Sequence, residues 1–217
     1  ASTHATDNKH HILLAASGSV ATIKLPLIAA ALAAHPTVSL RLLLTPSATH
    51  FLQSQSAEQP ALESLAAIPR VDAIYQDADE WTVPWVRGNS ILHIELRKWA
   101  HVMVVAPMSA NTLAKMVHGV ADNLLTSVIR AWDTTGLVDL YRKKLILVAP
   151  AMNTAMWEQP ITGRQVGVLE GEWGVKVGGW VELLRPQEKT LSCGDTGNGA
   201  MYEWTGIVRE VERRLGL

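Results

Sequence analysis

The stretch HILLAASGSVATIK, residues 11–24, decides the fold. Its apolar start, 11–16, predicts a buried strand, and Ser17-Gly18-Ser19 predicts a tight turn. A helix is expected over 22–34, with Pro26 bending it or shifting its start. Strand, small-residue turn and helix in this order begin a βα unit. The chain is therefore expected to build a parallel sheet covered by helices.

The same alternation continues along the chain and predicts an α/β protein with a three-layer, doubly wound parallel sheet. Further strands are expected over 38–44, 71–75, 102–105 and 144–149, with weaker ones over 175–177 and 181–184. Helices are expected to begin at 48 and to span 92–100, 111–118, 123–132, 155–169 (interrupted at Pro160) and 207–215. Segment 54–70 is expected to be a variable excursion, and segments 77–89 and 190–200 are expected to be loops.

Composition restricts the class of protein. With 217 residues, 48% hydrophobic and 18% charged, the chain suits a single domain, 11–217, after a disordered polar tail, 1–10. The formal net charge of −1 and the lack of a basic patch argue against a nucleic-acid partner. No apolar run approaches the ~20 residues that span a bilayer, so no membrane contact is expected.

The cysteine and histidine content restricts the chemistry. The single cysteine, Cys193, excludes an intramolecular disulfide, and we expect a cytoplasmic protein. One cysteine and scattered histidines do not give the spacing of a metal site, so no metal is expected.

In doubly wound sheets, ligands bind beyond the carboxyl ends of the strands. Four predicted strands end in small or polar turns, at 17–19, 45–47, 106–112 and 149–154. These turns are expected to line one crevice. Taken singly, each has a structural alternative: 17–19 could be an ordinary tight turn, and a polar side chain in 107–112 could simply cap a helix. Met156 and Trp157 could belong to the core.

Two further residues are candidates for proton transfer. Cys193 lies in a glycine-rich loop, which suits a chemical role or a flap that closes over substrate, although a structural thiol remains an alternative. His93 is flanked by apolar residues on a short predicted helix. From its surroundings alone, a buried, hydrogen-bonded histidine is the alternative to proton transfer.

Taken together, the ordered segments resemble the flavin-dependent cysteine decarboxylase family, and within it the phosphopantothenoylcysteine decarboxylases of coenzyme A synthesis. The resemblance covers the chain from about Ile12 onward, whereas 54–70, 134–143 and 168–186 diverge. The matching segments are 18–21 (GSVA), 92–97 (LHIELR), 107–112, 122–126 (DNLLT), 130–133 (RAWD), 150–157, 193–195 (CGD) and 199–201 (GAM).

The resemblance implies a flavodoxin-like or Rossmann-like flavoprotein that binds FMN near a subunit interface of a homotrimer. It implies a carboxy-lyase that converts phosphopantothenoylcysteine to 4'-phosphopantetheine through a thioaldehyde and an enethiolate. His93 and Cys193 match the family's catalytic positions. The implied substrate-binding residues are Ala151, Asn153, Met156 and Lys189. The implied FMN-binding residues are Gly18, Ser19, Val20, Thr45, Ser47, Phe51, Ser109, Ala110, Asn111 and Thr112.

Other functions fit the same resemblance. Some relatives are inhibitory subunits of a protein phosphatase, and such a role would imply assembly with a paralogue or with the phosphatase. This chain lacks the long acidic tail often found in them, and it keeps His93, Asn153 and Cys193 together. A peptidyl-cysteine decarboxylase would use the same chemistry on another substrate. A flavin prenyltransferase is a more distant alternative.

Overall fold

The computed structural model describes residues 6–82, 84–139, 143–190 and 196–217. Its centre is a six-stranded parallel sheet in the order β3-β2-β1-β4-β5-β6. The order reverses between β1 and β4, as in doubly wound folds, so the predicted fold class is confirmed. The strands are β1 (His10–Ala16), β2 (Val38–Leu44), β3 (Val71–Tyr75), β4 (Val102–Met108), β5 (Leu145–Pro150) and β6 (Val181–Leu183), and an antiparallel hairpin adds β7 (Gln187–Thr190) and β8 (Thr196–Ala200).

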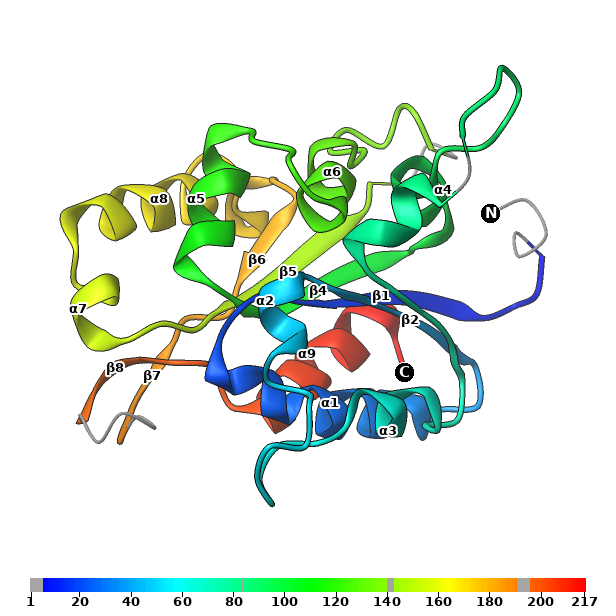
Figure 1. The fold of residues 1–217 in the computed structure, drawn as a ribbon. Helices are drawn as coiled ribbons and strands as arrows, with labels where there is room; N and C mark the ends of the chain where they lie inside the picture. The colour runs from blue at the N-terminus through cyan, green and yellow to red at the C-terminus, as the bar shows by residue number, and fades with distance from the viewer. Residues whose placement is uncertain (1–5, 83, 140–142, 191–195) are drawn as a thin grey trace.

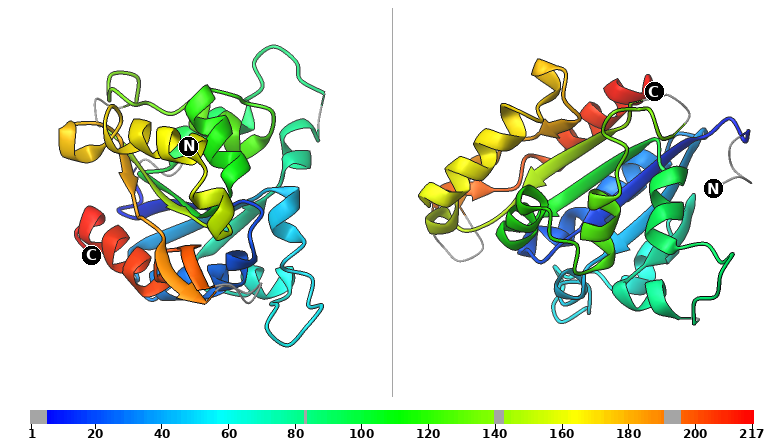
Figure 2. Two further views of the ribbon diagram at one scale, coloured as in Figure 1. Left: turned by 90° about the vertical axis from the view of Figure 1, so that its left-hand side faces the viewer. Right: turned by 90° about the horizontal axis from the view of Figure 1, so that it is seen from above.

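Helices cover both faces of the sheet and form the outer layers (Figures 1 and 2). On one face lie α1 (Leu25–Ala33), α3 (Leu62–Ala66) and α9 (Trp204–Leu215). On the other lie α4 (Leu92–Trp99), α5 (Ala110–His118), α6 (Leu124–Arg130) and α8 (Pro160–Glu170). Short turns of helix complete the chain: η2 (Val20–Lys24), α2 (Pro46–Thr49), η3 (Asp77–Trp81), α7 (Thr154–Trp157) and η4 (Val175–Val177).

The central strand shows why its sequence is apolar without interruption. Successive side chains of a strand point to opposite faces, and both faces are covered here. Ile12 and Leu14 pack into the core under α1 and α9, whereas Leu13 and Ala15 pack into the core under α5 and α6. All four side chains are fully buried. This strand thus holds the two cores together and ends at the point where strand order reverses.

Most predicted elements agree with the structure within a few residues. Strands β2 and β3 have the predicted bounds. The first α-helix begins at Leu25 with Pro26 in its first turn, so Pro26 shifts the start of this helix, as predicted. Pro160 likewise opens α8 and separates it from α7. Strand β1 begins at His10, one residue inside the predicted tail 1–10, of which residues 1–5 lie outside the described ranges.

Two local predictions are wrong, those for 175–177 and for 190–200. Segment 175–177 is a 3-10 helix rather than a strand, because Gly178 takes a left-handed φ of 85° and its amide donates to the Val175 carbonyl. Segment 54–70, expected only to be a variable excursion, contains the short helix α3. The supposed loop 190–200 contains strand β8, whose TGNGA sequence has low intrinsic preference for strands.

A buried carboxylate organises the segment that follows α6. Burial would raise the pKa of Asp133, but backbone amides at Gly136, Val138 and Asp139 and the Thr135 hydroxyl donate to it. These hydrogen bonds lower its pKa from the ordinary 3.8 to about 2. Asp133 is 2% exposed, so removing it would leave several donors unsatisfied in the interior.

We therefore expect Asp133→Ala to lower the free energy of unfolding by at least about 2 kcal/mol at pH 7, measured by urea denaturation. Because the folded-state pKa is depressed, this carboxylate stabilises the fold fully above its ordinary pKa. That contribution is lost as the pH falls through about 2. The difference between wild type and variant should therefore shrink in acid. A difference in unfolding free energy that does not change with pH would contradict the assignment of the effect to the Asp133 carboxylate. Glu63→Gln, at an exposed position, is the control.

Within the described ranges, every helix is too short or too polar to cross a bilayer. The same residues contain no group of three or more His, Cys, Asp or Glu side chains arranged to hold a metal ion.

Candidate active site

Four segments that follow β1, β2, β4 and β5 share one local design. In each, a polar side chain at the strand end caps the helix that comes next, which explains the Ser, Thr and Asn residues in these turns. The capping bonds join Ala21 N to Ser19 Oγ (3.4 Å), Ala48 N to Thr45 Oγ1 (3.3 Å), Thr112 N to Ser109 Oγ (3.2 Å) and Met156 N to Asn153 Oδ1 (2.9 Å).

The turn after β1 is tied to the turn after β4. The Ser17 hydroxyl donates to the Pro107 carbonyl at 3.3 Å and accepts from the Ser109 amide at 2.8 Å. The same turn lies against α2, since a Cβ built on Gly18 would come within 2.6 Å of the Ser47 Cβ. Glycine is required at position 18 because a side chain there would collide with α2.

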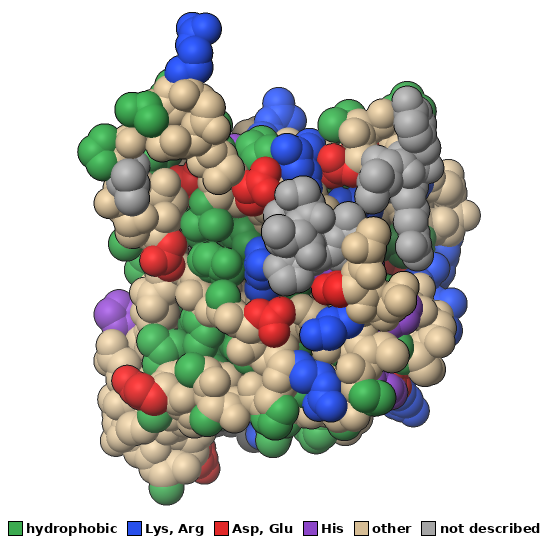
Figure 3. All heavy atoms as spheres, turned by 90° about the vertical axis from the view of Figure 1, so that its right-hand side faces the viewer, with side chains coloured by type: hydrophobic (Ala, Val, Ile, Leu, Met, Phe, Trp, Pro, Cys, Tyr) green, Lys and Arg blue, Asp and Glu red, His purple; other side chains and the backbone are tan. Residues whose placement is uncertain are grey.

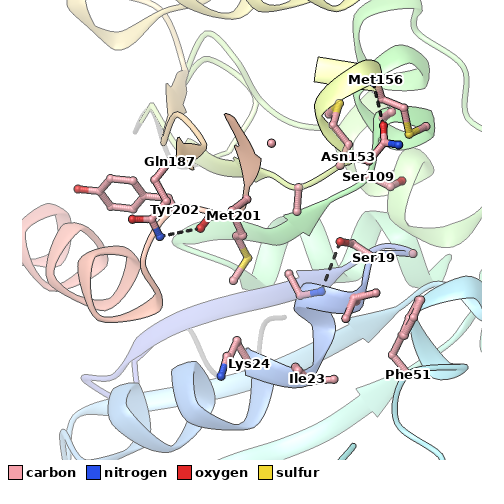
Figure 4. Close-up of a pocket in the computed structure, with 18 of the residues that line it drawn as sticks. Ser19, Ile23, Lys24, Phe51, Ser109, Asn153, Met156, Gln187, Met201 and Tyr202 are labelled. Carbon is pink, nitrogen blue, oxygen red and sulfur yellow. Dashed lines mark hydrogen bonds between the residues drawn. The ribbon is translucent and has the colours of Figure 1, made fainter. Parts of the chain in front are cut away.

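These turns surround a cavity of about 670 Å³, a size typical of small-molecule sites (Figure 4). The predicted crevice is therefore confirmed. Most residues predicted to hold the cofactor or substrate line it: Gly18, Ser19, Val20, Ser47, Phe51, Ser109, Ala110, Asn111, Ala151, Asn153 and Met156. Thr45 and Thr112 are buried behind the wall, where they support the caps of α2 and α5.

Asn153 has one amide atom left for a ligand. Its Oδ1 accepts from the Met156 amide, which fixes the orientation of the side chain. Its Nδ2 has no hydrogen-bond partner within the described ranges and can donate to an acceptor such as a carboxylate. Met156 is 48% exposed beside it and offers apolar contact.

Two further parts of the cavity wall were not predicted from the sequence. Ile23 and Lys24 come from η2, while Gln187, Met201 and Tyr202 come from the hairpin and the turn before α9. In Figure 4 Ile23 and Lys24 lie below the cavity, on the same side as Phe51, whereas Gln187, Met201 and Tyr202 lie on a separate side. Gln187 Nε2 donates to the Met201 carbonyl at 3.0 Å, which links β7 to this turn. The matching segment 199–201 was the one available signal for this wall.

Glycine allows the hairpin to approach the substrate-binding segment. The Met152 amide donates to the Gly199 carbonyl at 3.0 Å. A Cβ on Gly199 would lie only 2.0 Å from the Met152 carbonyl oxygen. A larger residue would therefore push β8 away from 151–154 and open the cavity on that side.

The predicted proton-transfer residues are not brought together within the described part of one chain. His93, the second residue of α4, is absent from the cavity lining, and its Nδ1 lies 2.7 Å from Glu80 Oε1. Cys193 lies outside the described residues, and for Lys189 the structure describes only the backbone, in β7. The described lining of the cavity therefore contains predicted binding residues but neither of the two predicted proton-transfer residues.

Comparison with known proteins identifies the family. The sequence matches the flavoprotein family over residues 1–216. The chain belongs to the flavoprotein family. This result agrees with the resemblance drawn from the order of the sequence segments.

Two curated relatives are similar to this flavoprotein chain over nearly its whole length. It is 41% identical over 209 residues to the phosphopantothenoylcysteine decarboxylase of Mus musculus, covering 96% of this chain and 89% of the mouse protein. It is 42% identical over 212 residues to a probable thymidylate synthase of Schizosaccharomyces pombe. That match covers 98% of this chain but only 30% of the yeast protein.

Solved structures show the same fold. A cysteine-to-serine mutant of PPC decarboxylase complexed with pantothenoylaminoethenethiol superposes with a TM-score of 0.76 at 40% identity, covering 96% of this chain and 100% of that one. The FMN binding protein AtHal3 gives a TM-score of 0.75 at 40% identity, covering 95% and 96%. Both similarities span nearly the whole flavoprotein, including the cavity-forming turns.

The residues around the cavity fit a flavin mononucleotide. Ala110 and Asn111 are first-turn residues of α5, whose amides lack intrahelical acceptors and suit a phosphate. The Ser19, Ser47 and Ser109 side chains add hydroxyl groups, and Phe51 adds an apolar contact for a flat ring. Small residues at 18, 110 and 151 keep the cavity open.

Proposed function

We propose that this flavoprotein is an FMN-dependent carboxy-lyase that converts phosphopantothenoylcysteine to 4'-phosphopantetheine in coenzyme A synthesis. One observation carries the proposal. A single cavity at the sheet's switch point gathers the residues matched to FMN binding and the Asn153–Met156 segment matched to substrate binding. About 40% identity to named decarboxylases of this substrate supports it.

The proposed roles follow from the chemistry of each group. When bound, FMN supplies reversible hydride chemistry at the carbon that bears the substrate sulfur. Asn153 Nδ2 holds the substrate carboxylate, since its Oδ1 is used by the cap of α7. Cys193, which lies outside the described residues, is assigned the proton donation in the final step. His93 transfers a proton before carbon dioxide is lost.

We also propose a homotrimer in which His93 of one protomer reaches the cavity of a neighbour. In its own chain His93 does not line the cavity, and the adjoining segment exposes Trp81, Trp85 and Ile91. Figure 3 looks onto the side that carries this segment, where hydrophobic side chains lie at the surface among interspersed charges. Exposed apolar groups of this kind favour an interface between copies. A cytoplasmic location remains part of the proposal.

Mixing two inactive variants tests the shared site. His93→Asn removes the donated residue, and Asn153→Asp damages the cavity that receives it. If each site combines two chains, mixed trimers contain some sites with both residues intact, and activity returns after the proteins are unfolded and refolded together. Mixtures that stay inactive, although pull-down through a tag carried by only one variant shows mixed trimers, would place His93 and Asn153 in the same chain's site.

Lys24 is expected to select the phosphorylated substrate. It lines the cavity across from Asn153 in Figure 4, so a substrate held by its carboxylate at Asn153 can extend its phosphate toward Lys24. We expect Lys24→Gln to raise KM for phosphopantothenoylcysteine about tenfold, because a charge-assisted hydrogen bond is lost. KM for pantothenoylcysteine should change little. An equal change for both substrates would contradict this role, and Lys176→Gln is the surface control.

The substrate class is tested by carbon dioxide release from three compounds at equal concentration. Phosphopantothenoylcysteine should react fastest, pantothenoylcysteine more slowly, and a peptide with a carboxyl-terminal cysteine least. Preference for the peptide would replace the proposal with a peptidyl-cysteine decarboxylase. Failure of all three with FMN bound would remove the decarboxylase function itself.

A further inference from the structure

We infer that Glu80 is a positioning residue that fixes the tautomer and the direction of His93. The inference rests on the proposed role of His93 in proton transfer. The Glu80 carboxylate binds His93 at two points: Oε1 lies 2.7 Å from the imidazole Nδ1, and Oε2 accepts from the His93 backbone amide at 3.2 Å. One carboxylate therefore fixes both the ring and the first turn of α4.

The chemistry of these contacts determines where the imidazole proton lies. A carboxylate only accepts hydrogen bonds, so a neutral His93 beside it carries its proton on Nδ1. The lone pair is then left on Nε2, which can accept a proton from substrate. The Glu80 side chain is 6% exposed and that of His93 is 25% exposed. The buried carboxylate thus holds the inner nitrogen, and part of the ring remains accessible from outside.

The turn that carries Glu80 is itself held in place. Asp77, at the start of η3, accepts from the Leu124 amide at 3.0 Å, in the first turn of α6. Asp79 accepts from the Gln76 amide at 2.7 Å and closes the start of η3. This turn is therefore anchored to α6 through Asp77 and to α4 through Glu80. Such outer partners commonly orient a functional histidine.

Glu80→Gln gives a specific test because it keeps the shape and changes the donor pattern. If the Gln carbonyl accepts from the His93 backbone amide, its NH₂ group faces Nδ1. Two donors then oppose each other unless the imidazole proton moves to Nε2. The substitution should therefore reverse the tautomer and occupy the lone pair that accepts the substrate proton. We expect kcat for carbon dioxide release to fall about 10–100-fold, with KM nearly unchanged.

The tautomer is read directly from the ¹⁵N NMR shifts of the His93 ring in FMN-loaded protein labelled at histidine. Wild type should show protonated Nδ1, and Glu80→Gln should show protonated Nε2. Glu63→Gln is the matched control, since it makes the same change in an exposed carboxylate on α3, away from the turn that carries Glu80. It should change neither the tautomer nor kcat. Glu80→Asp, which keeps the charge, should retain more activity than Glu80→Gln.

The outcomes separate this inference from the function on which it rests. If His93→Asn is inactive while Glu80→Gln has the wild-type tautomer and full activity, the role of Glu80 is refuted and the proposed function stands. If His93→Asn is fully active, the assigned role of His93 fails first. A Glu80→Gln protein that loses activity but keeps protonated Nδ1 would also refute the tautomer mechanism.

Discussion

His93→Asn is expected to lower the rate of carbon dioxide release by at least about 100-fold, because a positioned proton-transfer group contributes about 10²–10⁴-fold. In the proposed trimer His93 reaches the substrate in a neighbour's cavity and is not among the residues matched to FMN binding, so flavin content should stay at the wild-type level. The assay is single-turnover release of labelled carbon dioxide. Since the proposed role precedes loss of carbon dioxide, no oxidised, decarboxylated product should accumulate.

His118→Asn is the control for that experiment. His118 ends α5 and lines no part of the cavity, so carbon dioxide release should be unchanged. Wild-type turnover by His93→Asn would remove proton transfer from the role of His93. Loss of bound flavin in that variant would show instead that the residue supports cofactor binding.

Gly18→Ala is expected to weaken FMN binding about 10–100-fold. Its new Cβ would lie 2.6 Å from the Ser47 Cβ, so the turn after β1 and helix α2 must move apart. Overpacking of this kind costs about 1–3 kcal/mol, and each 1.4 kcal/mol changes affinity about tenfold. Fluorescence titration of the apoprotein with FMN measures the change.

Two further variants show whether the contact itself is responsible. Gly163→Ala adds the same methyl group in α8, where nothing lies within 4 Å, and should leave FMN affinity unchanged. Adding Ser47→Gly to Gly18→Ala removes the clashing Cβ and should recover part of the affinity. Wild-type affinity in Gly18→Ala would mean that this turn does not shape the flavin site.

The sequence predicted the sheet and the position of the cavity because both depend on local patterns. The apolar runs at β1 and β2 give buried strands, and parallel strands place their carboxyl ends on one edge of the sheet. Polar caps such as Ser109 and Asn153 therefore had to meet at that edge. Pro26 and Pro160 lie in the first turns of α1 and α8, where a backbone N–H has no intrahelical acceptor, so proline costs no hydrogen bond there. They therefore mark where each helix begins.

The remaining features depend on contacts between distant segments. The Glu80–His93 pair joins a 3-10 turn to a helix 13 residues later, and no local pattern indicates which acidic residue of 77–80 makes the contact. Strand β8 was missed because its glycines have low strand preference, although Gly199 is required where the backbone meets Met152. Lys24 was missed because η2 was interpreted as part of one regular helix.

The most direct test of the account is to load the purified protein with FMN, record its visible spectrum and add phosphopantothenoylcysteine. We predict a yellow protein that releases one carbon dioxide per substrate, forms 4'-phosphopantetheine and ends with its flavin oxidised, because hydride is taken and returned. A colourless protein that cannot be reconstituted with FMN, or one that binds FMN and releases no carbon dioxide from this substrate, would contradict the account.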